Sequence, residues 1–513
     1  MTVRRTAAAA LAALFALPLA AGGCQGDCCT VDSFSIPLGR APSGAPLLPN
    51  AFDAGADAPP LPDGGALLAL AGPPGGPPGI TMVVDTASPF TVMAGPSTGA
   101  LQTRLTGFDL YGVGVPPTSE QMSPPLRGKF RNWDVLTFPL SAVGDGSGEP
   151  PGGVLGADVL RGYSVDLRLA GPCPASLPGT CASMTLWHRL APDQAFLEDA
   201  GYAVLAFTPY GGGEITAQGD PDFLGLRGPV TVPPTRVVLR ACAVPAAFSP
   251  VPDPLAPPPP PCCTAADALA QATGVDLSLL VDTGIGPLVL SASAWARVVA
   301  NAAARTPALP LPPLPDAPSP SATPLRVATW PAPIDVLLWA AIPRFALVNL
   351  EAGANNDPGP CVELGRSRRT ELVSYATVNA PDLHICGQRC DRDPNQTGLA
   401  QNSAAYLEIN GNIPVAVIAD NDPFLQALRF DVLPEGPELD GLVGAAALGA
   451  ARVELDYLSS PGRAVFSCET GVPRSSCWAA ARCPQLPDSN THHDCFGLGF
   501  HGLPESCAPS TCP

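Results

Sequence analysis

The sequence predicts a mostly-β protein made of two related lobes, and two observations lead to this prediction. Short runs rich in Val, Ile and Leu are bounded by Gly, Pro and Asp, which is the pattern of strands separated by turns. Two unrelated phrases also recur in the same order along the 513 residues, which indicates an internal repeat. The 66 Pro and 52 Gly residues favour strands, turns and coil over long helices.

The chain begins with a segment that predicts export. Residues 1–23 carry two arginines, then an apolar stretch and small residues, as in a signal peptide; the stretch is too short and wrongly flanked for a membrane span. The ending Ala21-Gly22-Gly23-Cys24 resembles a bacterial lipobox, in which the cysteine carries the lipid, although Leu is usual where Ala21 stands. We therefore expect a lipoprotein anchored through Cys24 on the periplasmic or cell-surface side of a membrane, with residues 24–32 as its tether. An ordinary signal peptide cleaved nearby is the alternative.

Eight apolar runs after this segment are expected as strands. They are residues 66–72, 80–85, 135–140, 163–169, 235–242, 277–282, 415–420 and 451–458. Two stretches have the composition of helices, residues 261–273 and 291–304. Two Pro-dense breaks, Phe248–Cys263 and Thr306–Pro324, are expected as surface insertions, because Pro disfavours helix interiors and central strands.

The cysteines and the charge bound the compartment and the partners. The 17 cysteines suit an exported chain, because disulfides persist outside the cytosol. Local pairs are expected at Cys173–Cys181 and Cys386–Cys390, and residues 469–513 are expected to form a Cys-rich extension. The net charge of −18 argues against nucleic acid and anionic membrane surfaces as partners. His492-His493-x-Cys495, like His384 beside Cys386, is interpreted as disulfide framework with solvated histidines, so no metal or cofactor is expected.

The internal repeat has two elements. Val84-Asp85-Thr86-Ala87-Ser88 corresponds to Val281-Asp282-Thr283-Gly284-Ile285, and each phrase ends an apolar run. Further along, residues 152–169 align without gaps to residues 440–457. The identical pairs in that alignment are Gly153/Gly441, Gly156/Gly444, Ala157/Ala445, Leu160/Leu448, Val165/Val453 and Leu167/Leu455. An aspartate that ends a strand and caps a turn is the alternative interpretation of each copy.

This pattern, an apolar strand with Asp-Thr-Gly and later an apolar-apolar-Gly element, resembles the pepsin and retropepsin aspartic proteases. The resemblance implies a bilobal aspartic-protease-like fold, with residues 33–235 as the first lobe and 236–468 as the second. It also implies one catalytic aspartate in each lobe, Asp85 and Asp282. The apolar-apolar-Gly elements, which end in Gly156 and Gly444, would pass under the aspartate loops and support them.

The resemblance implies a particular chemistry. Two carboxyls close enough to share one proton cannot both ionise, so their titrations separate. One then acts as general base on a water molecule, while the other donates its proton to the scissile carbonyl oxygen. The pair titrates as a unit, so the roles of Asp85 and Asp282 are left open. By the same resemblance, Thr86 and Thr283 would hydrogen-bond across the lobes, and Ser88 would bond the outer oxygen of Asp85.

The sequence also departs from the family pattern. Small residues at Ala87 and Gly284 keep the backbone close to the carboxylates, but Ala87 replaces the usual Gly. Its methyl group is expected to crowd the dyad or to force a φ that Ala tolerates poorly. Ile285 stands where Ser, Thr or Ala is usual, so Asp282 lacks hydroxyl support. A candidate flap is the stretch Asp109–Val115, with Tyr111 as the residue that covers substrate.

The expected function is therefore an aspartic-type endopeptidase of the cell envelope. It would be a monomer that acts on a peptide or protein substrate. The alternative is a non-catalytic envelope lipoprotein with a protease-like fold that binds peptide or glycan. A fold that is kept while catalysis is lost agrees with the departures at Ala87 and Ile285.

Overall fold

The structure is a computed structural model of the whole chain. It describes residues 33–41, 65–95, 102–112, 127–138, 140, 150–172, 180–187, 202–207, 209–219, 228–232, 234–246, 274–305, 308–315, 323–330, 332–349, 359–365, 367–368, 404–432, 438–469, 472 and 476–480. The signal peptide, the tether with Cys24 and the helix expected at 261–273 lie outside these ranges. So do the Cys386–Cys390 pair, Cys173 and most of the Cys-rich extension.

The fold is mostly β and bilobal, as the sequence predicts. Each of the eight runs expected as strands overlaps a strand of the structure. The strands of the first half are β1 (Ser33–Arg40), β2 (Leu67–Gly72), β3 (Ile80–Val84), β4 (Val92–Ala94), β5 (Gln102–Tyr111), β6 (Arg127–Phe138), β7 (Gly153–Leu155), β8 (Ser164–Pro172) and β9 (Thr180–Trp187). Those that follow are β10 (Ala203–Phe207), β11 (Pro209–Tyr210), β12 (Gly213–Gly219), β13 (Gly228–Val232), β14 (Arg236–Ala243), β15 (Val275–Asp282), β16 (Leu288–Ser291), β17 (Val336–Val348), β18 (Tyr406–Ile418), β19 (Gly441–Gly444), β20 (Ala451–Asp456), β21 (Gly462–Cys468) and β22 (Cys477–Ala480).

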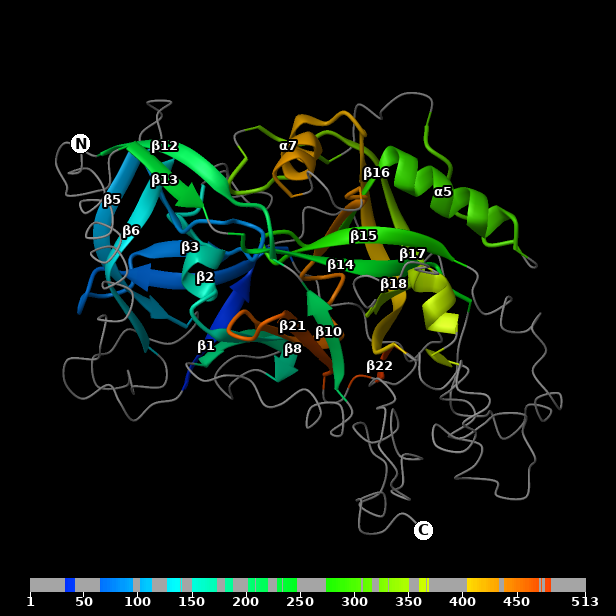
Figure 1. Cartoon of the computed structure of the whole chain (residues 1–513), viewed down its shortest axis with the longest axis horizontal. Helices are drawn as coiled ribbons and strands as arrows, with labels where there is room; N and C mark the ends of the chain where they lie inside the picture. Colours follow the sequence, from blue (N-terminus) through cyan, green and yellow to red (C-terminus); the bar gives the residue numbers. More distant parts are fainter. Residues whose placement is uncertain are drawn as a thin grey trace, which may run out of the picture.

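The two lobes repeat one strand arrangement. In the first lobe, β7 pairs parallel to β3 and antiparallel to β4, and β4 pairs parallel to β6. In the second lobe, β19 pairs parallel to β15 and antiparallel to β16, and β16 pairs parallel to β18. Figure 1 shows the two groups side by side, with the blue and cyan strands of the first lobe apart from the green and orange strands of the second. The repeat found in the sequence is therefore a repeat of structure.

A shared sheet joins the lobes. Its order is β10-β21-β20-β8-β9-β1, and the antiparallel pair β20–β8 at its centre brings Val453 opposite Leu167 and Leu455 opposite Val165. These are residues of the two aligned segments, so the second element of the repeat meets its own copy. β10 lies before residue 236, where the second lobe is predicted to begin, yet it pairs with β21 of that half.

The side chains of β3 and β15 alternate between two apolar clusters, as strand geometry requires. Met82 and Val84 face the main core, which also holds Leu279 and Val281 of β15. Val83 faces a smaller cluster of the first lobe, and Leu280 faces one of the second lobe. Continuing the alternation places the Asp85 side chain on the face of Val83 and that of Asp282 on the face of Leu280.

The described helices are short. α2 (Ala157–Leu160) follows β7, α5 (Ala292–Ala303) lies within the stretch 291–304 that the sequence predicts as helical, and α7 (Pro423–Val432) was not predicted. α5 begins where the Ser291 hydroxyl accepts the Ala294 N–H at 3.2 Å, an N-cap bond. It buries Trp295 and Val298 against the core. Within the described part of the chain, no helix is both long and apolar enough to cross a membrane.

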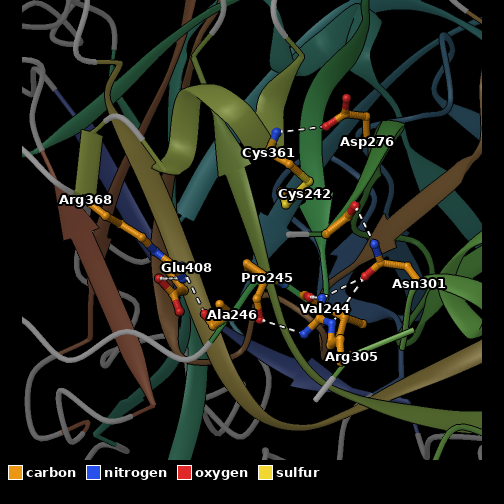
Figure 2. Close-up of a disulfide and its surroundings, with 11 residues drawn as sticks. Cys242, Val244, Pro245, Ala246, Asp276, Asn301, Arg305, Cys361, Arg368 and Glu408 are labelled. Atoms are coloured by element: carbon orange, nitrogen blue, oxygen red, sulfur yellow. Dashed lines mark hydrogen bonds and ion pairs between the residues drawn. A yellow bond between two sulfur atoms is a disulfide. The ribbon is translucent and has the colours of Figure 1, made fainter. Parts of the chain in front are cut away.

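The second lobe contains a disulfide that the sequence does not predict. Cys242 of β14 is joined to Cys361, 119 residues later, and the Cys361 N–H donates to Asp276 at 2.8 Å (Figure 2). Nearby, Arg368 and Glu408 form a fully buried ion pair at 2.6 Å. A second disulfide, Cys468–Cys477, connects β21 to β22. β22 is the start of the Cys-rich extension, and it pairs antiparallel with β18.

Candidate active site

Asp85 and Asp282 each lie where a central strand ends. Asp85 follows β3, and its N–H donates to the Leu155 carbonyl of the neighbouring β7 at 3.1 Å. Asp282 is the last residue of β15 and pairs with Gly444 of β19. Each aspartate is thus fixed by a backbone pairing with the apolar-apolar-Gly element of its own lobe.

The two glycines of those elements lie directly against the aspartate loops. A Cβ atom at Gly156 would come within 2.0 Å of the Phe90 carbonyl oxygen, and one at Gly444 within 2.5 Å of the Gly286 carbonyl oxygen. No side chain fits in either place. The residue after each glycine bonds the loop in the same way. The Ala157 N–H donates to the Ser88 carbonyl at 2.8 Å, and the Ala445 N–H donates to the Ile285 carbonyl at 2.9 Å.

Thr86 and Thr283 connect the two loops to each other. The Thr86 N–H donates to the Thr283 hydroxyl at 3.2 Å, and the Thr283 N–H donates to the Thr86 hydroxyl at 3.2 Å. Each hydroxyl also donates to the carbonyl that precedes the opposite aspartate, Thr86 to Val281 at 3.0 Å and Thr283 to Val84 at 2.7 Å. All four bonds are buried, so the loops are held as one unit.

These loops bring the two carboxyls together. Asp85 and Asp282 are each only 2% exposed, and they lie close enough for the charge of Asp85 to raise the pKa of Asp282. Gly284 makes this approach possible, because a Cβ atom there would lie 2.7 Å from the Asp85 carboxyl carbon and 3.1 Å from the Asp282 Oδ1. The residues that the sequence predicts as a dyad are therefore neighbours in the fold.

The surroundings favour a proton on the pair. Burial raises the pKa of Asp85, while N–H bonds from Ser88 and Ala87 to its Oδ1, both 2.8 Å, lower it. Burial, and then the charge of Asp85, raise the pKa of Asp282 well above its ordinary value. Asp282 receives one N–H bond, from Gly284 at 2.8 Å. Asp282 thus accepts fewer N–H donors than Asp85, and burial raises the pKa of both carboxyls.

Two expectations about the loops need correction. The Ser88 hydroxyl donates to the Phe90 carbonyl at 2.8 Å rather than to Asp85, and it is the Ser88 backbone that bonds the carboxylate. Ala87 does not require a glycine backbone, because Val244 is the one non-Gly residue with positive φ among those described. The Ala87 methyl group instead belongs to the apolar cluster of the second lobe, together with Ile285.

Tyr111 is not brought to the dyad. It is 3% exposed, and its hydroxyl donates to the Gly76 carbonyl at 2.5 Å, in the turn between β2 and β3. Asp85 follows the opposite end of β3. Residues 113–126, which connect β5 to β6 and include the rest of the predicted flap, lie outside the described residues.

A hairpin that the sequence does not predict crosses from the second lobe to the first. Leu325 and Ile334 exchange backbone hydrogen bonds of 3.0 and 2.8 Å and close it. Its tip residue Ala328, 1% exposed, packs in the cluster of the first lobe that contains Val83. Val327 and Leu325 pack in the cluster of the second lobe. The hairpin therefore covers apolar surface on the faces of β3 and β15 that carry the aspartates.

A second unforeseen residue is Arg236, at the start of β14. Its Nε donates to the Ala87 carbonyl at 3.1 Å, and its charge lowers the pKa of both aspartates against the larger effect of burial. The sequence shows it as one of two arginines in the apolar run 235–242, and only the packing of β14 in the fold reveals its place.

The predicted lipidation site and the two histidine-containing stretches cannot be placed in the fold. Cys24, His384 and the His492–Cys495 stretch lie outside the described residues. In the described part of the chain, no group of three or more His, Cys, Asp or Glu side chains is placed to hold a metal ion.

Comparison with known proteins adds little. No family model matches the chain, and no curated protein matches it. A solved structure that is similar to it is basic 7S globulin from soybean, with 10% identity, 85% of this chain and 95% of that chain covered, and a TM-score of 0.34.

Proposed function

We propose that the protein is an aspartic-type endopeptidase of the cell envelope, in which Asp85 and Asp282 activate a water molecule to hydrolyse peptide bonds. The single observation that supports this most is the meeting of two buried carboxyls at Gly284, one from each copy of an internal repeat. A structural aspartate that only caps a turn has no reason to meet its own copy. The resemblance of both sequence elements to pepsin and retropepsin proteases supports the same proposal.

The arrangement suits general acid–base chemistry. In the state with one shared proton, the carboxylate accepts a proton from water as the water oxygen attacks the carbonyl carbon. The protonated carboxyl donates to the carbonyl oxygen in the same step. The tetrahedral diol then collapses: the carboxyl that took the proton from water donates it to the amide nitrogen, the other carboxylate takes a proton from a diol hydroxyl, and the C–N bond breaks, which restores the state with one proton. The Thr86–Thr283 bonds hold the two carboxyls in place throughout.

The envelope location rests on the leader and on the disulfides. The N-terminal 23 residues resemble a signal peptide, and Cys24 stands where a lipobox places its lipid. Cys242–Cys361 and Cys468–Cys477 suit an oxidising compartment. The acidic net charge of −18 favours a peptide or protein substrate over nucleic acid.

A second candidate function is a non-catalytic envelope lipoprotein that binds peptide or glycan. The observation that favours it is the covering of the site by apolar groups. Ala87 and Ile285, the two departures from the family pattern, lie in one apolar cluster with Val327 of the hairpin. The tip residue Ala328 occupies surface on the face of Asp85.

A cleavage assay separates the two functions. The purified protein is incubated with a denatured protein substrate from acid to neutral pH, beside Asp85→Asn and Asp282→Asn. Asp420→Asn is the matched control, because Asp420 bonds Ser293 and lies outside the dyad. We expect cleavage by wild type and control, and a loss of about 100-fold or more in each dyad variant. Cleavage that survives in either dyad variant, or no cleavage by folded wild type, would contradict the proposal.

A further inference from the structure

We propose that Arg236 is a positioning residue of the dyad, whose guanidinium holds the Asp85 loop from the opposite lobe and is the counter-cation of the proton-sharing pair. This inference rests on the proposed function, in that a dyad must exist for Arg236 to serve it. It assigns a specific role to a residue that the family pattern does not contain. The inference stands on strand register, on one hydrogen bond and on charge.

Strand register places Arg236 beside Asp282. β14 and β15 pair antiparallel, with Leu239 opposite Leu279 and Val238 opposite Leu280. The pairing ends with Val238 and Leu280. Arg236, the first residue of β14, and Asp282, the last residue of β15, each lie two residues beyond that pair, so they lie at the same end of the two strands and on the same face.

The guanidinium then reaches the other lobe. Its Nε donates to the Ala87 carbonyl at 3.1 Å. That carbonyl belongs to the peptide unit whose N–H, on Ser88, donates to the Asp85 Oδ1 at 2.8 Å. A peptide unit is planar, so fixing its oxygen fixes its N–H, and a bond at one end strengthens the bond at the other. Arg236 therefore orients a donor that Asp85 uses.

The positive charge of Arg236 also stabilises the negative charge of the dyad. A dyad with one proton carries one negative charge, and both carboxyls are almost fully buried. A buried charge is costly unless a counter-charge lies near, and arginine keeps its charge at all relevant pH values. The positive charge of Arg236 lowers the pKa of both Asp85 and Asp282, opposing burial, which raises both.

The other titratable groups near the dyad do not compete with this role. Tyr457 faces it, but burial and then the charge of Asp85 raise the pKa of the Tyr457 phenol, so the phenol stays neutral. Tyr210 lies opposite Arg236 in the pairing of β11 with β14. Arg236 is thus the cation that balances the pair among the described residues that act on it.

The loss of Arg236 is expected to change how stability depends on pH. Burial places the folded pKa of the dyad above that of the unfolded chain, so its contribution to stability is fully present below the unfolded pKa. That contribution is lost as pH rises through the folded pKa. Without Arg236 the folded pKa rises further, so this loss extends to higher pH. The pH range in which the dyad holds one proton moves upward with it.

The test uses the purified protein with Arg236→Gln, Arg236→Lys and Arg161→Gln. Arg161 is exposed, follows α2 and controls for the loss of one positive charge. Two readouts are taken, the Tm from pH 3 to 9 and the pH profile of kcat/KM. We expect both to shift toward higher pH in Arg236→Gln and to coincide with wild type in Arg161→Gln. Arg236→Lys keeps the charge and lacks Nε, so we expect a reduced kcat/KM with an unshifted pH profile.

The two readouts separate this inference from the proposed function. A shifted Tm profile in a protein that cleaves nothing supports the role of Arg236 and refutes the endopeptidase. Active protein whose Tm and kcat/KM profiles are unchanged in Arg236→Gln overturns the role of Arg236 alone. If Arg236→Gln does not fold, Arg236→Lys decides, since a profile shifted to higher pH there would contradict the counter-cation.

Discussion

Thr86 and Thr283 each accept the backbone N–H of the other, at 3.2 Å in both directions, and each donates its hydroxyl across the lobe boundary. The relationship is reciprocal because the two residues occupy the same place in the repeat. It links the backbone on both sides of Asp85 to the backbone on both sides of Asp282. These bonds therefore hold the two aspartate loops together.

We expect Thr86→Val to lower the free energy of unfolding. Valine keeps the shape but leaves the Thr283 N–H and the Val281 carbonyl buried without their partner, at about 1–3 kcal/mol for each group. Thr86→Ser, which keeps the hydroxyl, is the matched control. Urea denaturation followed by circular dichroism measures the difference. Equal stability of the Val and Ser variants would show that the bonds do not hold the loops.

Glycine at 284 and alanine at 87 should respond in opposite ways to one methyl group. Gly284→Ala places a Cβ atom 2.7 Å from the Asp85 carboxyl carbon and must push the pair apart. We expect kcat/KM to fall by about 100-fold, the effect of displacing a reacting group by about 1 Å. Ala87→Gly removes a methyl group that packs in an apolar cluster, and the backbone at Ala87 does not have a positive φ. We therefore expect this variant to remain active. Comparable losses in both variants would contradict the asymmetry.

The hairpin that Leu325 and Ile334 close should limit access to the aspartates. Its tip residue Ala328 packs against the first lobe, on the face of β3 that carries Asp85. Because Leu325 and Ile334 are paired, residues 326–333 can be replaced by an Asn-Gly turn. We expect the shortened protein to cleave a protein substrate faster than wild type. Ala328→Gly, which keeps the hairpin, is the control, and a slower shortened protein would contradict a covering role.

The disulfide between Cys242 and Cys361 should contribute more stability than that between Cys468 and Cys477. The first closes 119 residues and the second closes 9, and a longer closed loop restricts the unfolded chain more. We expect Cys242→Ala with Cys361→Ala to cost about 3–5 kcal/mol, and the second pair less. Denaturant unfolding of the two double variants measures this. A larger loss in the Cys468–Cys477 variant would contradict the prediction.

The sequence predicts the two aspartates and their support well. Asp85 and Asp282 end buried strands, and the phrases that contain Gly156 and Gly444 recur without gaps. Those signals are local, and the repeat doubles each of them. Because identical elements fold alike and must bury the same faces, finding both copies predicts the two lobes and the meeting of the aspartates.

Contacts between segments that are far apart in the sequence cannot be predicted from such local patterns. Arg236 reaches the dyad through the register of β14 with β15 and through the approach of the other lobe. Cys242 bonds to Cys361, 119 residues away, and the pairing of cysteines cannot be deduced from their spacing in the sequence. Tyr111 has the expected neighbours in sequence, but the pairing of β5 with β2 directs its hydroxyl to Gly76. A local pattern carries no information on such pairings.

The central claim is that Asp85 and Asp282 share one proton, and carbon-13 NMR of protein labelled at the aspartate carboxyls tests it most directly. Asp85→Asn and Asp282→Asn assign the two signals. We expect the pair to titrate in two separated steps, the upper one above the ordinary aspartate range because of burial and the neighbouring charge. Asp85→Asn should lower the pKa of Asp282, since the charge that helps to raise it is gone. Two carboxyls that titrate together near the ordinary value, unaffected by either substitution, would contradict the account.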